Sequence, residues 1–545
     1  MRATKMNNLF SKVRFILAPL LAVTCFLMAA AANATAPGIT GTTFSLTAKD
    51  AYISQPDGAS VYSWGYGCSA SFSPAFAPKP GGTDLASANC PTMQVPGPTL
   101  IVTEGQAVTV TLTNGLPASA GNTSILFPGF NVTSPTGSGV AGLLTQEAVP
   151  GGTVIYTFTA GSPGTRAYYS GTQGDLQVEM GLYGAIIVLP ANVPANCTTG
   201  FLATQNQAAA THWGEADFRL SKAAYNHART CYDREYLFQF SEMDPDIHAR
   251  ALAQVIAISS CVPPTNTSLP PCPTTLNVAT EPYHPAYFMI NGRSMPDDMD
   301  SNYAAQYPHQ PYNGNPHMHP GEQVLLRIIG QGRWQHPFHE HGNHVRILGR
   351  DGNLILSSAA PDELNLAGPL LFTTTTTPGQ AMDGIFYWTG KGLNWDAYGH
   401  KPTSADPLAK LACIPDANGY NTGAPTAINY YEWCQDHNKP LQALPFGDVA
   451  SGGPVTLPDP NILANGAWYG GSPYLGPNAT VRAVGSTGTT PPSGTIANSP
   501  TGEAGFAFMW HSHNEREITT NNSFPGGMLM MMLVDSREFV IDESN

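Results

Sequence analysis

The sequence predicts an all-β protein built from two sandwich-type domains, and three observations lead to this fold class. The chain has 545 residues, which is enough for two or more domains. Only 11% of the residues are charged, whereas glycine (55) and proline (48) are abundant, as expected for many turns and long ordered loops. Short segments rich in β-branched and aromatic residues alternate with these turns along most of the chain.

The first domain is predicted over residues 35–190. Residues 99–113 alternate in polarity and are rich in β-branched side chains, which predicts two strands around a Glu-Gly turn. Residues 154–159 and 184–189 are predicted as further strands, and together these segments make a unit of sandwich size. A connector of mixed character follows over residues 191–231.

The second domain is predicted over residues 232–545. Its expected strands are residues 236–240, 287–291, 323–329, 344–348, 371–376, 385–388, 506–511 and 528–534. Residues from about 395 to 500 are rich in glycine, proline, asparagine and serine. An irregular segment of this length is unusual inside a domain, so we interpret it as a large surface insertion.

Residues 1–34 have the pattern of a signal peptide. A positively charged start precedes the apolar run Phe15–Ala30, and Ala32-Asn33-Ala34 is a small-x-small cleavage site. A membrane anchor is the rival interpretation, but the apolar run is short and ends in small residues. The sequence therefore predicts export to a periplasmic or extracellular location, with no membrane attachment after cleavage.

The cysteine count favours disulfides. Cleavage removes Cys25 and leaves eight cysteines, and an even number in an exported chain indicates disulfide bonding. The simplest pairing joins sequence neighbours, namely 68–90, 197–231, 261–272 and 413–434. No pair forms a Cys-x-x-Cys motif, which argues against a zinc-thiolate site.

The net charge of −14 argues against nucleic acid or an anionic membrane surface as a partner, because both repel a negative protein. We expect a soluble, acidic surface.

Two segments contain His-x-His in a strand context, at His339 and His341 and at His511 and His513. Residues i and i+2 of a strand point to the same face, so each strand presents two imidazoles side by side. If the strands face each other, four imidazoles meet in a site that favours copper, with zinc as the alternative. The competing interpretation is a metal-free, hydrogen-bonded histidine core.

A third His-x-His, His317-Met318-His319, precedes Pro320-Gly321, which has the composition of a turn. We expect this segment to be a surface loop.

At these residues the chain resembles the multicopper oxidase family. HPFHEHGNH followed by VRILGRDG resembles the family's His-Pro-x-His-x-His-Gly motif, and WHSHNERE with FPGGMLMMMLVD resembles its C-terminal His-Cys-His and Gly-Met motif. PGPTLIVTEGQAVTVTLTN and GTRAYYS with GLYGAIIV resemble the start and the end of its first domain. The resemblance covers most of residues 95–190, 232–394 and 503–535, and it implies two cupredoxin-like Greek-key β-sandwich domains.

The resemblance also implies metal-site roles. In the family a type 1 copper takes electrons from the substrate, and a three-copper cluster passes them to dioxygen. His336 falls at a type 1 ligand position, whereas His339, His341, His511 and His513 fall at cluster positions.

Several family ligands are replaced in this sequence. Four of the eight cluster imidazoles are missing, because their positions hold Leu126, Pro128, Tyr169 and Gly171. The type 1 cysteine is replaced by Ser512, and the second type 1 histidine falls near Glu517. A blue copper site needs a thiolate sulfur, which serine lacks.

Two functions follow from this pattern. The first is an exported, multicopper-oxidase-like copper-binding protein, with oxidoreductase activity at a mononuclear or dinuclear site on the domain 2 histidines and without standard laccase-type activity. The second is a non-enzymatic exported scaffold or interaction protein with a metal-free histidine cluster. Two-domain relatives assemble as trimers with copper between subunits, so family analogy suggests a homotrimer. A trimer does not restore ligands that every subunit lacks. No substrate is indicated.

Overall fold

A computed structural model describes residues 36–78, 90–265, 268–357, 365–391, 414–427, 430–435, 471–475, 496–497, 504–535, 537 and 539–541. The predicted signal peptide, residues 1–34, lies outside them, as does most of the insertion predicted at about 395–500. Strands dominate the described residues, so the all-β, cupredoxin-like fold class is confirmed.

Domain 1 is a sandwich of two sheets with strand orders β10-β11-β5-β1-β4 and β3-β2-β6-β9. The two strands predicted around the Glu-Gly turn are present as β5 and β6, one in each sheet, and Gly105 between them adopts a φ of +82°. The strand bounds are β1 Gly38–Thr40, β2 Thr43–Ser54, β3 Ser60–Cys68, β4 Ala75–Ala77, β5 Leu100–Thr103, β6 Ala107–Asn114, β9 Thr153–Thr159, β10 Gly164–Tyr169 and β11 Tyr183–Leu189. A short hairpin, β7 Val140–Ala141 with β8 Gln146–Glu147, lies outside the sandwich.

Domain 2 is a second sandwich. One sheet has the order β13-β12-β15-β21-β17-β18, with β19 beside β17, and the other has the order β14-β25-β24-β16-β20. The bounds of the first sheet are β12 Arg234–Met243, β13 Tyr287–Ile290, β15 Gln323–Gly330, β17 Val345–Arg350, β18 Asn353–Leu354, β19 Leu370–Leu371 and β21 Ala381–Tyr387. Those of the second are β14 His317–Met318, β16 His336–Glu340, β20 Thr373–Thr376, β24 Ala504–Ser512 and β25 Leu529–Asp535. Apolar side chains of both sheets form one core, which includes Phe238, Phe338 and Trp510.

Part of the predicted insertion joins the second sheet. Strand β22, Gly471–Leu475, runs antiparallel to β24, and β23, Ile496–Ala497, pairs with β22. Strands β22 and β23 of the insertion therefore extend the sheet that carries two of the metal-site motifs.

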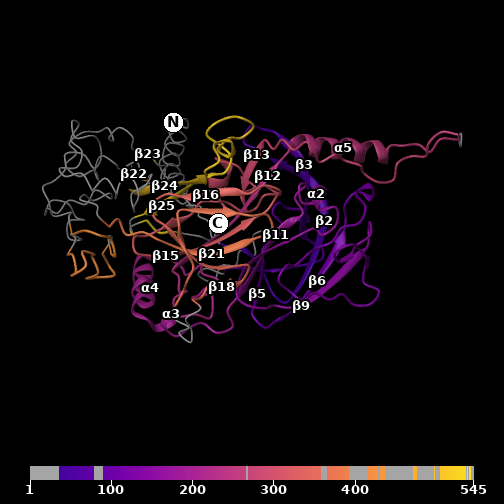
Figure 1. The fold of residues 1–545 in the computed structure, drawn as a ribbon. Coiled ribbons are helices and arrows are strands. Elements are labelled where there is room, and N and C mark those ends of the chain that lie inside the picture. The colour runs from indigo at the N-terminus through magenta and orange to yellow at the C-terminus, as the bar shows by residue number, and fades with distance from the viewer. Residues whose placement is uncertain are drawn as a thin grey trace, which may run out of the picture.

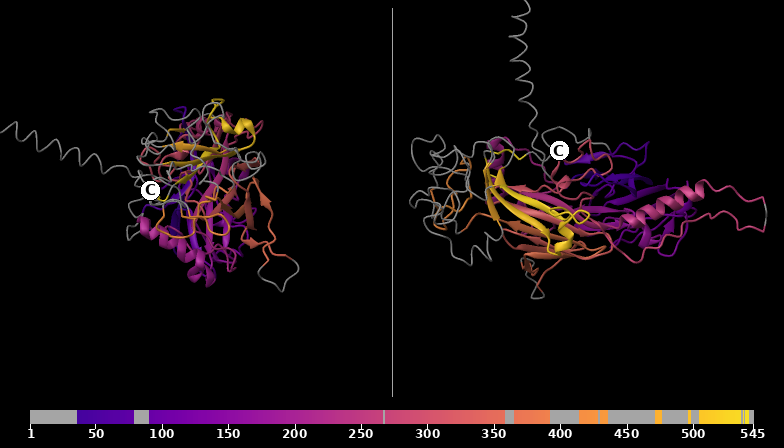
Figure 2. Two further views of the ribbon diagram at one scale, coloured as in Figure 1. Left: turned by 90° about the vertical axis from the view of Figure 1, so that its left-hand side faces the viewer. Right: turned by 90° about the horizontal axis from the view of Figure 1, so that it is seen from above.

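The two domains lie side by side, with domain 1 in indigo and magenta and domain 2 in orange and yellow (Figures 1 and 2). Ala185 and Ile187 of β11 belong to one apolar cluster with Ile329 of β15. A polar contact adds to it, because Asp383 of β21 accepts hydrogen bonds from the backbone N–H of Thr165 (3.0 Å) and from its hydroxyl (2.6 Å). Domain 1 therefore packs on the first sheet of domain 2, and the histidine motifs lie on the second.

Helices interrupt the predicted strand pattern at two places. The connector forms α3, Asn196–Thr199, and α4, Phe201–Trp213, whereas α5, Pro245–Ser259, follows β12 and packs on the core of domain 1 through Ile247 and Ala251 (Figures 1 and 2). The sequence carried a signal for α5, since Asp244 accepts a hydrogen bond from the N–H of Asp246 and proline stands at the first helical position. Among the described residues, no helix is long and apolar enough to span a membrane.

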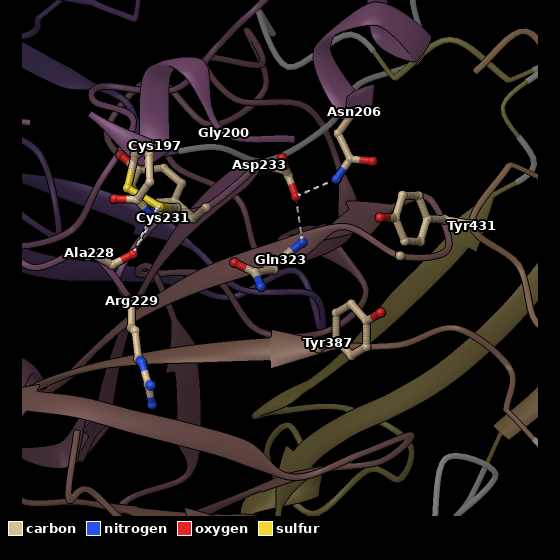
Figure 3. A pocket seen from close by; sticks show the side chains of 13 residues that line it. Cys197, Gly200, Asn206, Ala228, Arg229, Cys231, Asp233, Gln323, Tyr387 and Tyr431 are labelled. Carbon is tan, nitrogen blue, oxygen red and sulfur yellow. Dashed lines mark hydrogen bonds between the residues drawn. A yellow bond between two sulfur atoms is a disulfide. The ribbon is translucent and has the colours of Figure 1, made fainter. Parts of the chain in front are cut away.

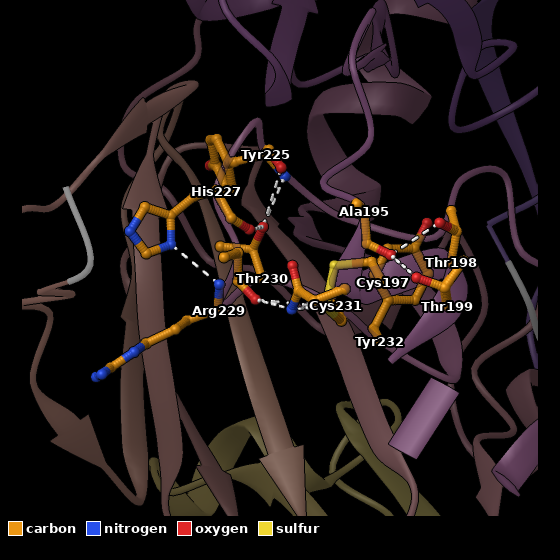
Figure 4. Close-up of a disulfide and its surroundings, with 12 residues drawn as sticks. Ala195, Cys197, Thr198, Thr199, Tyr225, His227, Arg229, Thr230, Cys231 and Tyr232 are labelled. Carbon is orange, nitrogen blue, oxygen red and sulfur yellow. Dashed lines mark hydrogen bonds between the residues drawn. A yellow bond between two sulfur atoms is a disulfide. The ribbon is translucent and has the colours of Figure 1, made fainter. Parts of the chain in front are cut away.

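Three of the four predicted disulfides are confirmed: Cys68–Cys90, Cys197–Cys231 and Cys261–Cys272. Cys434 is disulfide-bonded as well, but its expected partner Cys413 lies outside the described residues. The Cys197–Cys231 bond ties α3 to the segment that leads into β12, and beside it the carbonyl of Ala195 accepts hydrogen bonds from the hydroxyls of Thr198 and Thr199 (Figure 4).

Candidate metal centre

Two neighbouring strands bring the predicted histidines together. Strands β16 and β24 are antiparallel, and His339 lies directly opposite His511 in their register. Side chains of directly opposed residues project from the same face of a sheet. His341 and His513 continue the two strands, so all four imidazoles gather at one edge of the domain 2 sandwich. We call these four residues the four-histidine cluster.

The rings of the four-histidine cluster are in mutual contact. The ring centre of His339 lies 4.9 Å from that of His341, 5.6 Å from that of His511 and 4.8 Å from that of His513. The Nε2 atoms of His341 and His511 are 3.3 Å apart. Two nitrogens bound about 2.0–2.1 Å from one tetrahedral ion would be separated by about the same distance.

Hydrogen bonds orient two of the rings. Nδ1 of His511 lies 2.7 Å from the carbonyl oxygen of Ser512, which only accepts, so Nδ1 carries the proton and Nε2 keeps its lone pair toward His341. Nδ1 of His339 lies 2.6 Å from the hydroxyl of Thr373. A partner on the outer ring nitrogen is the arrangement that fixes metal-binding histidines in proteins.

The surroundings favour the neutral form of two of these rings, His339 and His511. Burial, together with the neighbouring imidazoles, lowers the pKa of His339 to about 4, and burial also lowers the pKa of His511. Neutral imidazole is the form that binds a metal ion. His339 and His511 therefore have the form that a metal ion such as copper or zinc can bind.

One edge of the cluster faces solvent. His339, His341 and His511 are buried, whereas the side chain of His513 is 48% exposed. Phe372 packs edge-on against His339 and is itself 51% exposed. A metal ion or a small ligand would reach the cluster from this side.

His336 lies in different surroundings. Its ring is fully buried, and its Nε2 and Nδ1 each lie 2.9 Å from a carboxylate oxygen, of Glu242 and Glu517 respectively. Ser512, at the position of the family's type 1 cysteine, donates a short hydrogen bond to the same Glu517 oxygen. Burial alone would lower the pKa of His336, but the hydrogen bonds to both carboxylates outweigh it and raise the pKa to about 9.

Sequence reasoning missed Glu242. The signal was present, because a glutamate within the otherwise buried strand β12 is rarely tolerated without a charged or hydrogen-bonding partner.

In domain 1 the two segments that carry histidines in the family pair with each other. Leu126 and Tyr169 exchange backbone hydrogen bonds of 2.7 and 3.3 Å. Gly171 has no room for a side chain, because a Cβ there would lie 2.8 Å from the side chain of Leu126. The hydroxyl of Tyr169 packs against Gly379, in the turn between β20 and β21. The two paired segments of domain 1 therefore carry leucine and tyrosine at these positions, and neither side chain is an imidazole.

The prediction of a surface loop at His317-Met318-His319 is wrong. His317 and Met318 form β14 at the edge of the second sheet, and all three residues are buried. His319 bonds through Nε2 to Glu215 (2.6 Å), and His317 bonds through Nδ1 to Asp535 (2.6 Å). The Pro-Gly turn does follow this strand. The histidines are nevertheless buried, because β14 pairs with β25 and the carboxylates of Glu215 and Asp535 lie against the two rings.

Glu215, His319 and Glu322 lie close enough for their ligand atoms to fall within 4.8 Å of one another. Arg234 occupies this place, since its guanidinium bonds to Glu215 at 2.6 Å and to Glu322. The group is therefore a buried ion-pair network that already contains its own cation.

A pocket of about 490 Å³ lies between the connector and the first sheet of domain 2 (Figure 3). Asp233 lines it and accepts hydrogen bonds from the backbone N–H of Gln323 (2.9 Å) and from Asn206 (2.9 Å), and the tyrosine rings of Tyr387 and Tyr431 form another side. Burial and the nearby Glu322 raise the pKa of Asp233 to about 6. The pocket has the size of a small-molecule site, and none of the predicted metal ligands lines it.

Comparisons with known proteins agree with these motifs. Two family models, both described as multicopper oxidase, match residues 86–193 and 279–384. The chain is 37% identical over 103 residues to the multicopper oxidase MCE of Talaromyces pinophilus, covering 18% of this chain and 16% of that protein. It is 38% identical over 96 residues to the L-ascorbate oxidase of Brassica rapa subsp. pekinensis, covering 17% and 16%. Each match thus spans about a sixth of the relative's length.

Among solved structures, the blue copper oxidase from Nitrosomonas europaea is similar, with a TM-score of 0.42, 15% identity and coverage of 90% of this chain and 85% of that chain. The multicopper oxidase mgLAC also has a TM-score of 0.42, with 14% identity and coverage of 92% and 88%.

Proposed function

Because this chain belongs to the multicopper oxidase family, we propose that it is an exported copper-binding protein that holds one copper ion on the four-histidine cluster. The observation that carries the proposal is the meeting of four imidazoles on β16 and β24, two of them with Nε2 atoms 3.3 Å apart. Zinc suits the same ligands and is the competing ion.

In this proposal some residues bind the ion and others orient the binding rings. The four imidazoles would hold the ion, while the carbonyl of Ser512 and the hydroxyl of Thr373 orient the rings of His511 and His339. Copper bound there would supply one-electron redox chemistry. The exposed edge at His513 and Phe372 gives a small molecule direct access.

Standard laccase-type turnover is not part of this proposal. Reduction of dioxygen by four electrons needs the full set of family ligands, whereas Leu126, Tyr169 and Gly171 stand at three of the cluster positions and Ser512 stands at the type 1 cysteine. Export is part of it, supported by the signal-like residues 1–34 and by the disulfides. By family analogy we also expect a homotrimer, and light scattering of the purified protein tests this by measuring its molar mass in solution.

The test is elemental analysis after incubation with copper and dialysis. We expect about one copper per chain, and a large loss in the His511→Ala, His513→Ala variant, because two imidazoles bind a metal far more weakly than four. The variant His212→Ala, His309→Ala, which removes two histidines outside the cluster, should bind like the wild type. Failure of the wild type to retain copper or zinc would favour the second function, a scaffold with a metal-free histidine cluster in which the 3.3 Å contact is an imidazole–imidazole hydrogen bond.

A further inference from the structure

We infer that a protonated imidazole replaces the type 1 copper in this protein: His336 is an imidazolium held between Glu242 and Glu517, and its position takes no metal. This inference concerns the metal-free protein and does not depend on copper binding at the four-histidine cluster.

The hydrogen-bond pattern identifies both glutamates as ionised. Glu242 accepts from the backbone N–H groups of Arg333 (2.7 Å) and Trp334 (2.9 Å) on Oε1 and faces His336 with Oε2. Glu517 accepts from the amide of Asn514 (2.9 Å) on Oε1. Its Oε2 accepts from the hydroxyl of Ser512 and faces His336. Three of the four oxygens accept hydrogen bonds from groups other than His336, and the fourth, Oε2 of Glu242, faces a ring nitrogen of His336; this arrangement fits two carboxylates.

Two ionised carboxylates require two N–H donors on the ring between them. A neutral imidazole has one N–H and one lone pair, so it would satisfy one glutamate and repel the other. The imidazolium has two N–H groups on opposite sides of the ring, and these match the two 2.9 Å contacts of His336. The raised pKa of His336 agrees with this geometry.

We call His336, Glu242 and Glu517 the ion triad. The other groups around it are polar or hold the carboxylates in place. The hydroxyl of Thr376 on β20 accepts a hydrogen bond from the backbone N–H of His336 (3.2 Å). The hydroxyl of Tyr283 lies 3.1 Å from Glu242 and 2.7 Å from Glu179. The guanidinium of Arg333 stacks on Tyr283 and bonds to the exposed Glu281 and to the carbonyl of Thr280. Among the described residues, the two ring nitrogens of His336 bond to Glu517 and Glu242.

The ion triad and its neighbour Ser512 connect several elements of domain 2. They join β12 through Glu242, β16 through His336, β24 through Ser512 and η7, Glu515–Ile518, through Glu517. In the family a metal ion joins elements at this place, and here charge-assisted hydrogen bonds do so without a redox centre. A copper ion on the four-histidine cluster would therefore have no electron donor within the chain at the family's position. Electrons would have to come from a molecule at the exposed edge.

The experiment is nuclear magnetic resonance of metal-free protein with ¹⁵N-labelled histidine at pH 7.0, with His336 assigned by its absence in His336→Gln. We expect two ring N–H groups on His336 and imidazolium nitrogen shifts. A neutral ring with one N–H would overturn the inference.

A second measurement uses Glu517→Gln. Loss of one carboxylate should lower the titration midpoint of His336 by about 1–3 pH units. The control Glu515→Gln lies on the same short helix with a 75% exposed side chain and should leave the midpoint unchanged. If Glu517→Gln does not fold, Glu242→Gln tests the other side of the ring with the same expectation. An unchanged midpoint in a folded variant would contradict the inference.

Metal exclusion is tested in the His511→Ala, His513→Ala variant. Adding one equivalent of copper should leave both His336 N–H signals in place after dialysis. Retained copper with loss of those signals would show that the position does take metal. Since the first measurement is made without metal, its outcome is independent of the copper proposal.

Discussion

The four-histidine cluster and the ion triad at His336 share strand β16, and yet they hold imidazoles in opposite states. His339 and His336 are both buried residues of β16, three positions apart. Burial disfavours the charged form of both, but the pKa of His339 falls to about 4 whereas that of His336 rises to about 9. The neighbours account for the difference, since His339 faces other imidazoles and His336 faces two carboxylates.

The neighbours of each imidazole therefore decide whether it holds a proton or keeps a lone pair free for a metal ion. Ser512 and Glu517 supply a hydrogen-bond donor and an anion beside His336, which stabilise a proton on this ring. In the four-histidine cluster the carboxylate of the exposed Glu515 lies 3.7 Å from His513, whereas burial and the neighbouring imidazoles favour the neutral form of His339, the form that metal binding requires.

The largest expected effect comes from breaking the triad. Glu517→Ala leaves a buried imidazolium with one partner and the hydroxyl of Ser512 without its acceptor. We expect the free energy of unfolding to fall by about 3–5 kcal/mol. Urea denaturation measures it, with Glu515→Ala as the exposed control, for which a change of at most about 0.5 kcal/mol is expected. Equal losses in both variants would mean that the triad adds nothing.

A second effect is alkaline destabilisation. Because the pKa of His336 is raised from 6.5 to about 9, the folded protein binds a proton that the unfolded chain releases in this window. Its contribution is complete below pH 6.5 and is lost as the pH rises through 9, on the order of 3 kcal/mol in all. Unfolding curves of wild type and His336→Gln should therefore converge between pH 6.5 and 9.5. Parallel curves would contradict the protonated state.

The four-histidine cluster should show a smaller effect of opposite sign. Its His339 has a pKa lowered from 6.5 to about 4, so the unfolded chain binds the extra proton. This contribution to stability is present above pH 6.5 and is lost as the pH falls toward 4. Metal-free wild type and His339→Gln should converge on acidification, and bound copper should move the wild-type loss to lower pH. Convergence at alkaline pH instead would show that the two regions had been assigned the wrong way round.

The smallest effect is expected in the visible spectrum. Copper-loaded wild type should lack the intense band of a blue site, because that band needs a cysteine thiolate. Ser512→Cys alone should not restore it, since Glu517 and Glu242 still hold both nitrogens of His336. An intense blue band in either protein would refute the assignment of the triad.

Much of this picture was accessible from the sequence. The strands around residues 99–113 and the meeting of the two His-x-His strands could be expected from side-chain periodicity and family motifs, whereas the register that places His339 opposite His511 came from the structure. Glu242 could not be paired with His336 in advance, because 94 residues separate them and only the packing of β12 behind β16 joins them. His317 was misjudged for the same reason, since its partner Asp535 lies 218 residues away.

The central claim is that copper binds the four histidines and not His336, and copper counts in three proteins test it most directly. Wild type, His336→Gln and His339→Gln, His341→Gln are loaded with copper, dialysed and analysed for metal per chain, with circular dichroism to verify folding. The account predicts about one copper in wild type, about one in His336→Gln and none in the double variant. Loss of copper from folded His336→Gln, with retention in the double variant, would contradict it.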